Sequence, residues 1–272
     1  MKIMKLKYLI LSLVWLSFAC VFANPASAVI NGEKVTEDYG WSVAFVAQDD
    51  GTTVASRVIC SGVLIDPEWV LTANHCWNAI NGSNAVIGRK DLAIANGEKQ
   101  RVTTSNFYRG NGGALAAHDV MLVKLPRDSN MPYIRLADSS NVGSWGVGGE
   151  VRIYGYGCTV EGNAGGSRYL KKARFNILTL SPDGPKATAA NLNAPYGMAM
   201  RGIDGGSCNA DSGAPYITST SAGPRVVAIN NLSNKFEREP YDTTSIGAKV
   251  GYRTTNANSP LNVEIRSTMS RF

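Results

Sequence analysis

The feature that most constrains the fold is a succession of short apolar or alternating segments, each bounded by turn-forming residues. Clusters of glycine, asparagine, aspartate and proline separate them, such as Asp49-Asp50-Gly51. Many short β-prone segments between turns are typical of a β-sandwich or β-barrel, so we predict an all-β fold. The segments are 41–47, 57–65, 69–72, 84–87, 120–125, 151–156, 173–178, 214–218, 225–229 and 246–250.

Residues 128–149 have the composition of a linker. They contain Ser139-Ser140-Asn141 and four glycines between residues 143 and 149. Such residues interrupt strands and helices, so we expect a boundary between two halves of the chain near 128–149. No internal repeat in the sequence proves that the two halves are alike.

One helix is predicted, at the C-terminus. Ser259 is suited to cap it and Pro260 to occupy its first position. Apolar residues then follow on one helical face, which predicts a helix that packs against the body of the fold. These residues are Leu261, Ile265, Met269 and Phe272.

Residues 1–28 have the pattern of a signal peptide. Lysines at positions 2, 5 and 7 precede an apolar stretch over 8–23, and Ala26-Ser27-Ala28 fits the small-x-small cleavage rule. We expect removal of 1–28, a secreted or periplasmic protein and no stable membrane anchor, because the stretch is short for a spanning helix. A retained anchor is one alternative. A lipid-modified Cys20 is another, but the preceding Ser17-Phe18-Ala19 lacks the usual aliphatic residue.

The charge of the chain is mild once the leader is set aside. The full sequence has 27 basic and 21 acidic residues, for a net charge of +6. Removing the three leader lysines leaves 24 basic and 21 acidic residues, a net charge of +3. With no basic block and no aromatic-interleaved stripe, we expect no nucleic-acid partner.

Four cysteines follow the leader: Cys60, Cys76, Cys158 and Cys208. An even number in an exported chain predicts two disulfides, but spacing alone leaves all three pairings open. A zinc site is the alternative. The chain contains no C-x-x-C pair and only two histidines, so we expect no metal and no cofactor.

Three segments carry residues suited to nucleophilic catalysis. Ser212 lies in the glycine-containing turn 208–215, and a serine hydroxyl needs a neighbouring base such as imidazole. The chain offers His75 and His118, and Asp119 precedes an apolar run. The order His75, Asp119, Ser212 is one of three known chain orders for a Ser-His-Asp triad.

Together these segments resemble the chymotrypsin-like (trypsin-like) serine protease family over nearly all of residues 29–272. The matching segments, in family order, are Val29-Ile30-Asn31-Gly32, the strand 60–65, Thr72-Ala73-Asn74-His75-Cys76, the run 119–125, Gly155-Tyr156-Gly157 at the opening of the second barrel, and Asp211-Ser212-Gly213-Ala214-Pro215. The resemblance implies one catalytic domain of two packed antiparallel β-barrels with the triad at their junction. The C-terminal helix is added to this architecture.

The resemblance also implies a role for each catalytic residue. Ser212 would be the nucleophile and His75 the general base, while Asp119 would hold the imidazole in its tautomer. His118 lies outside the histidine motif and is expected to be structural. The oxyanion hole would use the backbone N–H groups of Ala210 and Ser212. Ala210 stands where the family has glycine, so its methyl group is expected to hinder catalysis.

The primary specificity pocket is also implied by resemblance. Gly206 would lie at its base beside Ser207, and an apolar or small side chain would fit, since Asp204 lies two residues too early for a trypsin-like acid. Further substrate-binding residues would be Asn231, Leu232 and Ser233, with Ser245 as a third contributor to the wall. Asn231 also replaces a family serine that bonds the catalytic aspartate, and its amide could donate that bond.

By the same resemblance Cys60 pairs with Cys76 and Cys158 with Cys208. Val29 and Asp211 match an activation pair, in which a freed N-terminal ammonium meets a buried acid. Because the predicted cleavage site directly precedes Val29, export alone would create that ammonium, with no propeptide left.

These expectations predict a secreted serine endopeptidase that acts through an acyl-enzyme. Its partners would be a protein or peptide substrate and a proteinaceous inhibitor. A protease-fold binding protein with weak or lost catalysis is one alternative, favoured by Ala210. An esterase is another.

Overall fold

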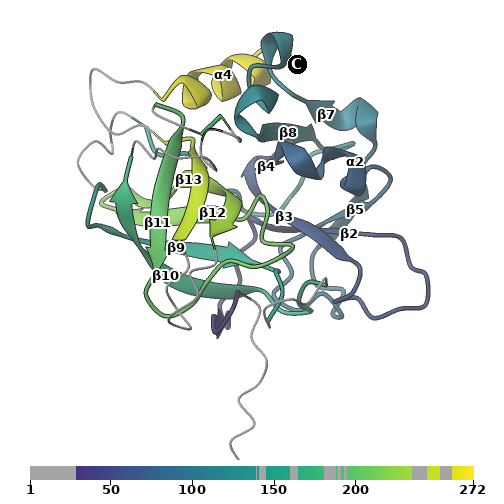
Figure 1. Ribbon diagram of the computed structural model, residues 1–272. Coiled ribbons are helices and arrows are strands. Elements are labelled where there is room, and N and C mark those ends of the chain that lie inside the picture. Colours follow the sequence, from purple (N-terminus) through teal and green to yellow (C-terminus); the bar gives the residue numbers. More distant parts are fainter. Residues whose placement is uncertain are drawn as a thin grey trace, which may run out of the picture.

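The computed structural model describes residues 29–138, 140, 145–159, 165–180, 188, 191–192, 195–234, 244–251 and 259–272. Their strands form two seven-stranded sheets in which every strand pairing is antiparallel, with few helices (Figure 1). The predicted leader 1–28 and linker residues 139 and 141–144 lie outside the described residues.

The first sheet has the strand order β6-β5-β2-β3-β4-β8-β7. Among the described strands its ends, β6 and β7, do not pair, so it is a half-open barrel. Its strands are β2 (Ser42–Val46), β3 (Val58–Asp66), β4 (Trp69–Ala73), β5 (Asn84–Ile87), β6 (Glu98–Arg101), β7 (Phe107–Tyr108) and β8 (Val120–Lys124).

The second sheet closes into a barrel. Its order is β1-β10-β11-β14-β13-β12-β9, and β9 also pairs with β10, which joins the two ends of a six-stranded ring. The N-terminal β1 lies on the edge of this ring although the strands that follow it belong to the first sheet. The strands are β1 (Glu33–Lys34), β9 (Glu150–Gly155), β10 (Lys171–Thr179), β11 (Gly197–Gly202), β12 (Pro215–Thr220), β13 (Gly223–Asn234) and β14 (Thr244–Lys249).

These two sheets confirm the predicted all-β fold with a C-terminal helix. In β10 the burial alternates, with Phe175 and Ile177 inside the barrel and Arg174 and Asn176 outside, as expected for a half-buried strand. Four strands were not anticipated: β1, β6, β7 and β11. They are very short, polar or glycine-bounded, and such sequences pair only because neighbouring strands are already in place.

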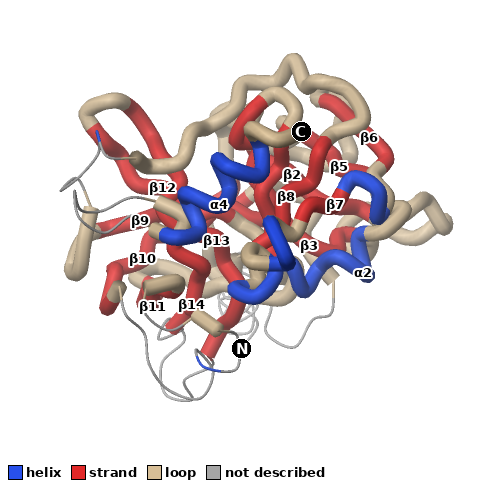
Figure 2. The backbone as a smooth tube through the Cα atoms, turned by 90° about the horizontal axis from the view of Figure 1, so that it is seen from above, coloured by secondary structure: helices blue, strands red, loops and turns tan. Residues whose placement is uncertain are grey.

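The C-terminal helix α4 (Pro260–Met269) starts at the predicted proline and lies across the junction of the two sheets (Figure 2). Leu261 and Ile265 are buried as expected. Two details of the prediction were wrong. The Ser259 side chain does not cap the helix but donates a hydrogen bond to the carbonyl of Lys249, and Phe272 is 61% exposed, lying against Tyr108 at the surface.

Five further short helices with described bounds lie in connections of the first sheet. They are the 3-10 turns Asn74–Cys76, Thr104–Asn106, Asn111–Gly113 and Ala116–His118, and the single-turn α2 (Trp77–Ile80).

Candidate active site

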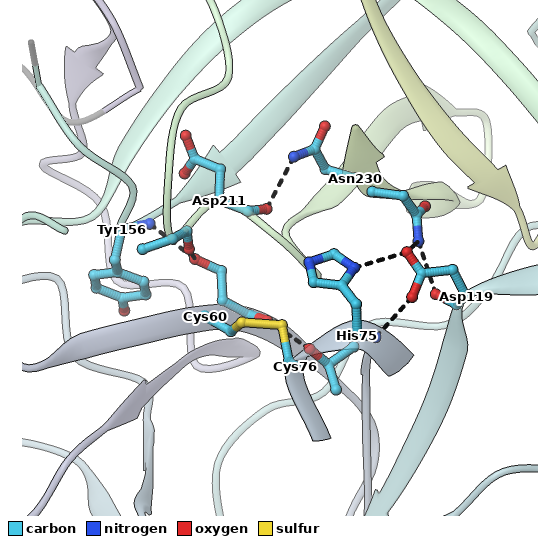
Figure 3. The surroundings of a disulfide bond; sticks show 11 residues. Cys60, His75, Cys76, Asp119, Tyr156, Asp211 and Asn230 are labelled. Atoms are coloured by element: carbon cyan, nitrogen blue, oxygen red, sulfur yellow. Dashed lines mark hydrogen bonds and ion pairs between the residues drawn. A yellow bond between two sulfur atoms is a disulfide. The ribbon is translucent and has the colours of Figure 1, made fainter. Parts of the chain in front are cut away.

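His75 and Asp119 are brought together by the register of two adjacent strands. β4 and β8 are antiparallel, with Ala73 opposite Val120. His75 follows the end of β4 by two residues and Asp119 precedes β8 by one, so both lie at the same edge of the sheet. The His75 Nδ1 and the Asp119 Oδ2 are 2.7 Å apart, and the His75 backbone N–H donates to Oδ1 at 2.7 Å (Figure 3). The Asp119 carboxylate therefore holds both the ring and the backbone of His75.

Asn231 completes the surroundings of Asp119 from the other barrel. Its Nδ2 donates to the Asp119 Oδ2 at 2.9 Å and to the Asp119 carbonyl at 2.7 Å, while its Oδ1 accepts from the Ala248 N–H at 2.7 Å. The register of β13 against β14 shifts at Asn231, and such bulges often re-aim one side chain beside an active site. Asn231 is 5% exposed and its amide is fully engaged, so it positions Asp119. Its expected place in substrate binding stays a prediction.

Ser212 is docked onto the first sheet through Ser61 of β3. The Ser61 N–H donates to the Ser212 carbonyl at 2.9 Å, and the Ser61 hydroxyl donates to the Ala210 carbonyl at 2.9 Å. Gly213 approaches so closely that an added Cβ would lie 2.2 Å from the Thr72 hydroxyl and 3.0 Å from the Ala73 nitrogen. Its φ of +82° also requires glycine. The serine turn is thereby held against the end of β4, two residues before His75.

Within the described residues, no hydrogen bond joins the Ser212 hydroxyl to His75. Ser212 is half-buried and the His75 side chain is 45% exposed, so both face an accessible site. In Figure 3 the ring nitrogen that faces away from Asp119 lies on the side of Asp211, the residue before Ser212. Catalytic hydrogen bonds are often long without substrate, so this arrangement is compatible with a nucleophile–base pair.

The turn before Ser212 presents two unused backbone donors. The Asp211 N–H donates to the Cys208 carbonyl at 3.1 Å, which closes a tight turn with Ala210 at its third position. Ala210 has φ of +68°, a left-handed conformation that costs an alanine about 1–2 kcal/mol. Among the described residues, neither the Ala210 N–H nor the Ser212 N–H finds an acceptor. Two adjacent free donors of this kind are what an oxyanion hole requires.

Asp211 is completely buried behind this turn. Its Oδ1 accepts from the Gly157 N–H at 2.8 Å and its Oδ2 from the Cys208 N–H at 2.9 Å. Gly155 and Gly157 make room for it, since a Cβ at either would lie within 2.2 Å of its carboxylate. Burial raises the pKa of Asp211 to about 7, and the two backbone donors oppose that rise. Gly155 ends β9, so this glycine segment follows the first strand of the second barrel and does not open that barrel as expected.

Two disulfides flank the site. One joins Cys60 of β3 to Cys76, the residue after His75, and the other joins Cys158 after β9 to Cys208 (Figure 3 shows the first). The Cys158 N–H also donates to the Asn209 carbonyl at 2.7 Å. Each bridge thus lies beside one catalytic segment, the first at the base and the second at the oxyanion turn.

Comparison with known proteins agrees with this architecture. The family model described as Trypsin matches residues 29–251. The chain belongs to the trypsin family. Snake venom serine protease rhinocerase 4 of Bitis rhinoceros is 31% identical over 199 residues, covering 70% of this chain and 72% of that protein. Kallikrein-4 of Homo sapiens is 28% identical over 225 residues, covering 78% and 79%.

Other similarities are more partial. Proproteinase E of Bos taurus is 32% identical over 127 residues, and the match spans about half of that relative, 47% of its length and 42% of this chain. The solved structure of human heparin binding protein aligns with a TM-score of 0.66 at 18% identity and covers 90% of this chain and 98% of its own. At that identity it supports the fold alone.

Against this trypsin-family background, three of the expected pocket residues meet in one hydrogen-bonded group. The Ser207 hydroxyl bonds the Ser245 hydroxyl at 2.7 Å and also bonds the Ser233 hydroxyl. Ser207 and Ser245 are buried, and Gly206 pairs with Ile30 in an isolated bridge. Ser233 lies within β13, which is longer than the strand that the sequence suggested.

Asp204 lies outside this group. Its Oδ2 pairs with the Arg174 Nε at 2.7 Å, and its Oδ1 accepts from the Arg174 N–H at 2.7 Å. Both side chains are nearly half exposed. Asp204 is therefore occupied at the surface and supplies no carboxylate to the pocket.

Val29 is buried in the core of the second barrel together with Ala214 and Tyr216. Its neighbour Ile30 accepts a backbone hydrogen bond from Gly206 at 2.9 Å. In the full chain the Val29 nitrogen is an uncharged amide, so it offers Asp211 no ammonium. The expected activation pair therefore remains a prediction for the cleaved chain.

Several residues at the site were not singled out from the sequence. Ser61 links the serine turn to the first sheet, and the Thr72 hydroxyl donates to the Ser61 carbonyl at 2.8 Å. Asn230 donates to the Asp211 carbonyl at 3.1 Å while accepting from the Tyr216 hydroxyl at 3.0 Å. Their only sequence signal was a polar residue within an otherwise buried strand. His118 stacks on Tyr196, with ring centroids 3.5 Å apart, and bonds the Asn191 carbonyl, outside the hydrogen bonds of Asp119.

The described residues contain no group of three or more histidine, cysteine, aspartate or glutamate side chains arranged to hold a metal ion. No described helix has the length and apolar character needed to cross a membrane.

Proposed function

We propose that this protein is a secreted serine endopeptidase that cleaves peptide bonds through a His75-Asp119-Ser212 triad. The observation that carries the proposal is the meeting of two separate halves. A His75–Asp119 pair at 2.7 Å lies on one barrel, and a serine turn with two free N–H donors is docked beside it. Membership of the trypsin family supports the same reaction class.

The reaction follows from these positions. His75 removes the proton from the Ser212 hydroxyl as its oxygen attacks the scissile carbonyl carbon, and the Ala210 and Ser212 N–H groups receive the oxyanion. His75 then donates that proton to the leaving amine, which breaks the peptide bond and leaves an acyl group on Ser212. Water, deprotonated by His75, attacks the acyl carbon. The bond from that carbon to the Ser212 oxygen then breaks, His75 returns the proton to this oxygen, and the acid is released. Asp119 accepts the hydrogen bond from the His75 Nδ1–H throughout.

Export would precede activity. The basic start, apolar stretch and small-x-small site of 1–28 support cleavage by a signal peptidase before Val29. The new Val29 ammonium would then pair with Asp211, and export would produce the active N-terminus directly. N-terminal sequencing of the exported protein should begin at Val29; another start would contradict this route.

A protease-fold binding protein is the second candidate. Ala210 in a strained conformation and the lack of a described Ser212–His75 hydrogen bond favour it. A structural relative named for heparin binding has the same fold. An esterase would share the triad but differ in substrate.

The deciding experiment is labelling of the protein, starting at Val29, with a fluorophosphonate probe, followed by incubation with peptides and small esters. We expect labelling at Ser212 and peptide cleavage, both abolished in Ser212→Ala. Labelling with hydrolysis of esters alone would indicate an esterase. A folded protein that is neither labelled nor active would support the binding protein.

A further inference from the structure

We infer that the substrate pocket accepts only a small uncharged side chain, alanine, serine or glycine, on the acyl side of the cleaved bond. This inference rests on the proposed function. It is carried by three hydroxyls, those of Ser207, Ser233 and Ser245, hereafter the serine cluster. They come from three separate segments, and the Ser207 hydroxyl bonds both of the others.

The serine cluster lies beside the reacting groups. Ser207 directly precedes Cys208, which opens the oxyanion turn. Ser233 follows Asn231, the residue that holds Asp119, by two positions on β13. The hydroxyl bridge between Ser207 and Ser233 therefore joins the segment leading to Ser212 and the segment beside Asp119. A substrate side chain entering between these segments meets the bridge.

The cluster is closed from behind. Ser245 is opposite Ser233 in the pairing of β13 with β14, is fully buried, and bonds Ser207 at 2.7 Å. The fully buried Tyr216 interacts with both Ser207 and Ser245, and its own hydroxyl donates to Asn230 at 3.0 Å. Each of these hydroxyls has a hydrogen-bond partner within the protein, so none of them needs a polar group of the substrate as a partner.

A large side chain would have to break this network. Opening the Ser207–Ser233 bridge leaves hydroxyls without partners in a buried site, which opposes binding of leucine or phenylalanine. Among the described residues, a lysine or arginine would find no free carboxylate at the serine cluster, because Asp204 is paired with Arg174 at the surface and Asp211 accepts from the Gly157 and Cys208 N–H groups. A short side chain ends above the bridge and leaves it intact.

The test is a cleavage profile over a peptide library, followed by kcat/KM for matched substrates with alanine or leucine at this position. In the unaltered protein we expect alanine to exceed leucine by about a hundredfold. Ser233→Gly and Ser245→Gly remove the bridge and its support, and each should raise the leucine-to-alanine ratio by about tenfold. Ser233→Ala removes the hydroxyl but keeps the Cβ, which separates hydrogen bonding from volume. Ser219→Gly, at an exposed serine of the same barrel, is the control and should leave the ratio unchanged.

A binding measurement keeps the test independent of catalysis. Peptides ending in alanine or phenylalanine are titrated into Ser212→Ala by calorimetry, where we expect the alanine peptide to bind more tightly. Selective binding by a protein that never cleaves peptides would overturn the proposed function but support the pocket. Equal or tighter binding of the phenylalanine peptide would overturn the pocket whatever the catalytic result. A cleavage profile led by lysine, arginine or phenylalanine would do the same.

Discussion

The two barrels contribute to the site in different physical ways. The first supplies His75 and Asp119 from neighbouring strands in fixed register, and every oxygen of the Asp119 carboxylate has a donor. The second supplies Ser212 from a turn that contains a left-handed alanine and rests on a buried carboxyl group with no cationic partner among the described residues. The base is therefore preformed by the sheet, whereas the oxyanion turn depends on a few individual contacts.

This difference indicates where activity can be regulated. A pair set by strand register keeps its relative position as long as the sheet stays folded. A turn held by one carboxyl group and one disulfide responds to cleavage at Val29, to pH and to single substitutions.

The largest effect is expected from the triad itself. Ser212→Ala or His75→Ala should lower peptidase kcat by about three to six orders of magnitude, and Asp119→Asn by about four. Because the residues act as a unit, the double variant Ser212→Ala/His75→Ala should lose little more than either single variant. Circular dichroism controls for folding. Undiminished hydrolysis by folded Ser212→Ala would remove the triad assignment.

The disulfides should contribute unequally. Cys60–Cys76 closes 16 residues and Cys158–Cys208 closes 50. Loop-closure entropy predicts losses of about 3 and about 4 kcal/mol in the free energy of unfolding when each pair is replaced by serine. Urea unfolding measures both. Cys158 and Cys208 hold the oxyanion turn. We therefore also expect that their replacement lowers kcat by a larger factor than it changes KM. Non-reducing peptide maps that join Cys60 to Cys158 would contradict the pairing.

Asp211→Asn tests the support of the oxyanion turn. In the protein starting at Val29 it should lower kcat by about a hundredfold, comparable to the loss of one oxyanion donor, with His75 and Ser212 still in place. A Met-Val29 protein produced without export should show a similar loss. Full activity of either variant would show that the oxyanion turn does not depend on the pair formed by Val29 and Asp211.

In the full chain, the free energy of unfolding should depend on pH through the titration of Asp211. The pKa of Asp211 is raised from 3.8 to about 7, so the folded state binds this proton more tightly than the unfolded state. Stability should therefore fall as pH rises from about 4 to about 7, and be flat on this account above that window. Asp211→Asn removes this slope. Urea titrations across the window give the comparison, and parallel pH profiles for both proteins would contradict the titration.

Asn231 measures the contribution that the second barrel makes to the first. Asn231→Ala removes two hydrogen bonds to Asp119 and should lower kcat by about 10- to 100-fold. Asn231→Ser keeps a hydroxyl donor and should retain most of the kcat of the unaltered protein. The pH profile of kcat/KM distinguishes two explanations. If Asn231 positions Asp119, the substitution shifts the profile; if it only stabilises the fold, the profile stays where it is.

Ala210→Gly should have the smallest effect, in the opposite direction. Glycine adopts a φ of +68° without the alanine penalty, so we expect stabilisation by about 1 kcal/mol. If the methyl group also hinders the oxyanion donor, kcat rises by up to about tenfold. Thermal unfolding and steady-state kinetics measure the two effects separately. A destabilised variant would show that the turn already favours alanine.

Much of this protein was determined by local sequence. Alternating apolar segments between turn residues require strands, and Pro260 with the apolar face at Leu261 and Ile265 requires a terminal helix, because these patterns act within one element. The residue types at His75, Asp119 and Ser212 restrict the chemistry in the same local way. Their family order is enough to propose the triad.

The tertiary structure decided what depends on contacts far apart in the chain. It placed Asn231 at a bulge facing Asp119, turned the Ser259 hydroxyl toward Lys249, and joined Ser207, Ser233 and Ser245 through their hydroxyls. It also exposed Phe272, which its helical spacing had suggested was buried. The spacing of residues in the sequence indicates which side chains share one face of a helix or strand. Their partners across the fold are set by strand register, and by the need of buried polar groups for hydrogen bonds. Those are properties of the packed chain, and no single segment encodes them.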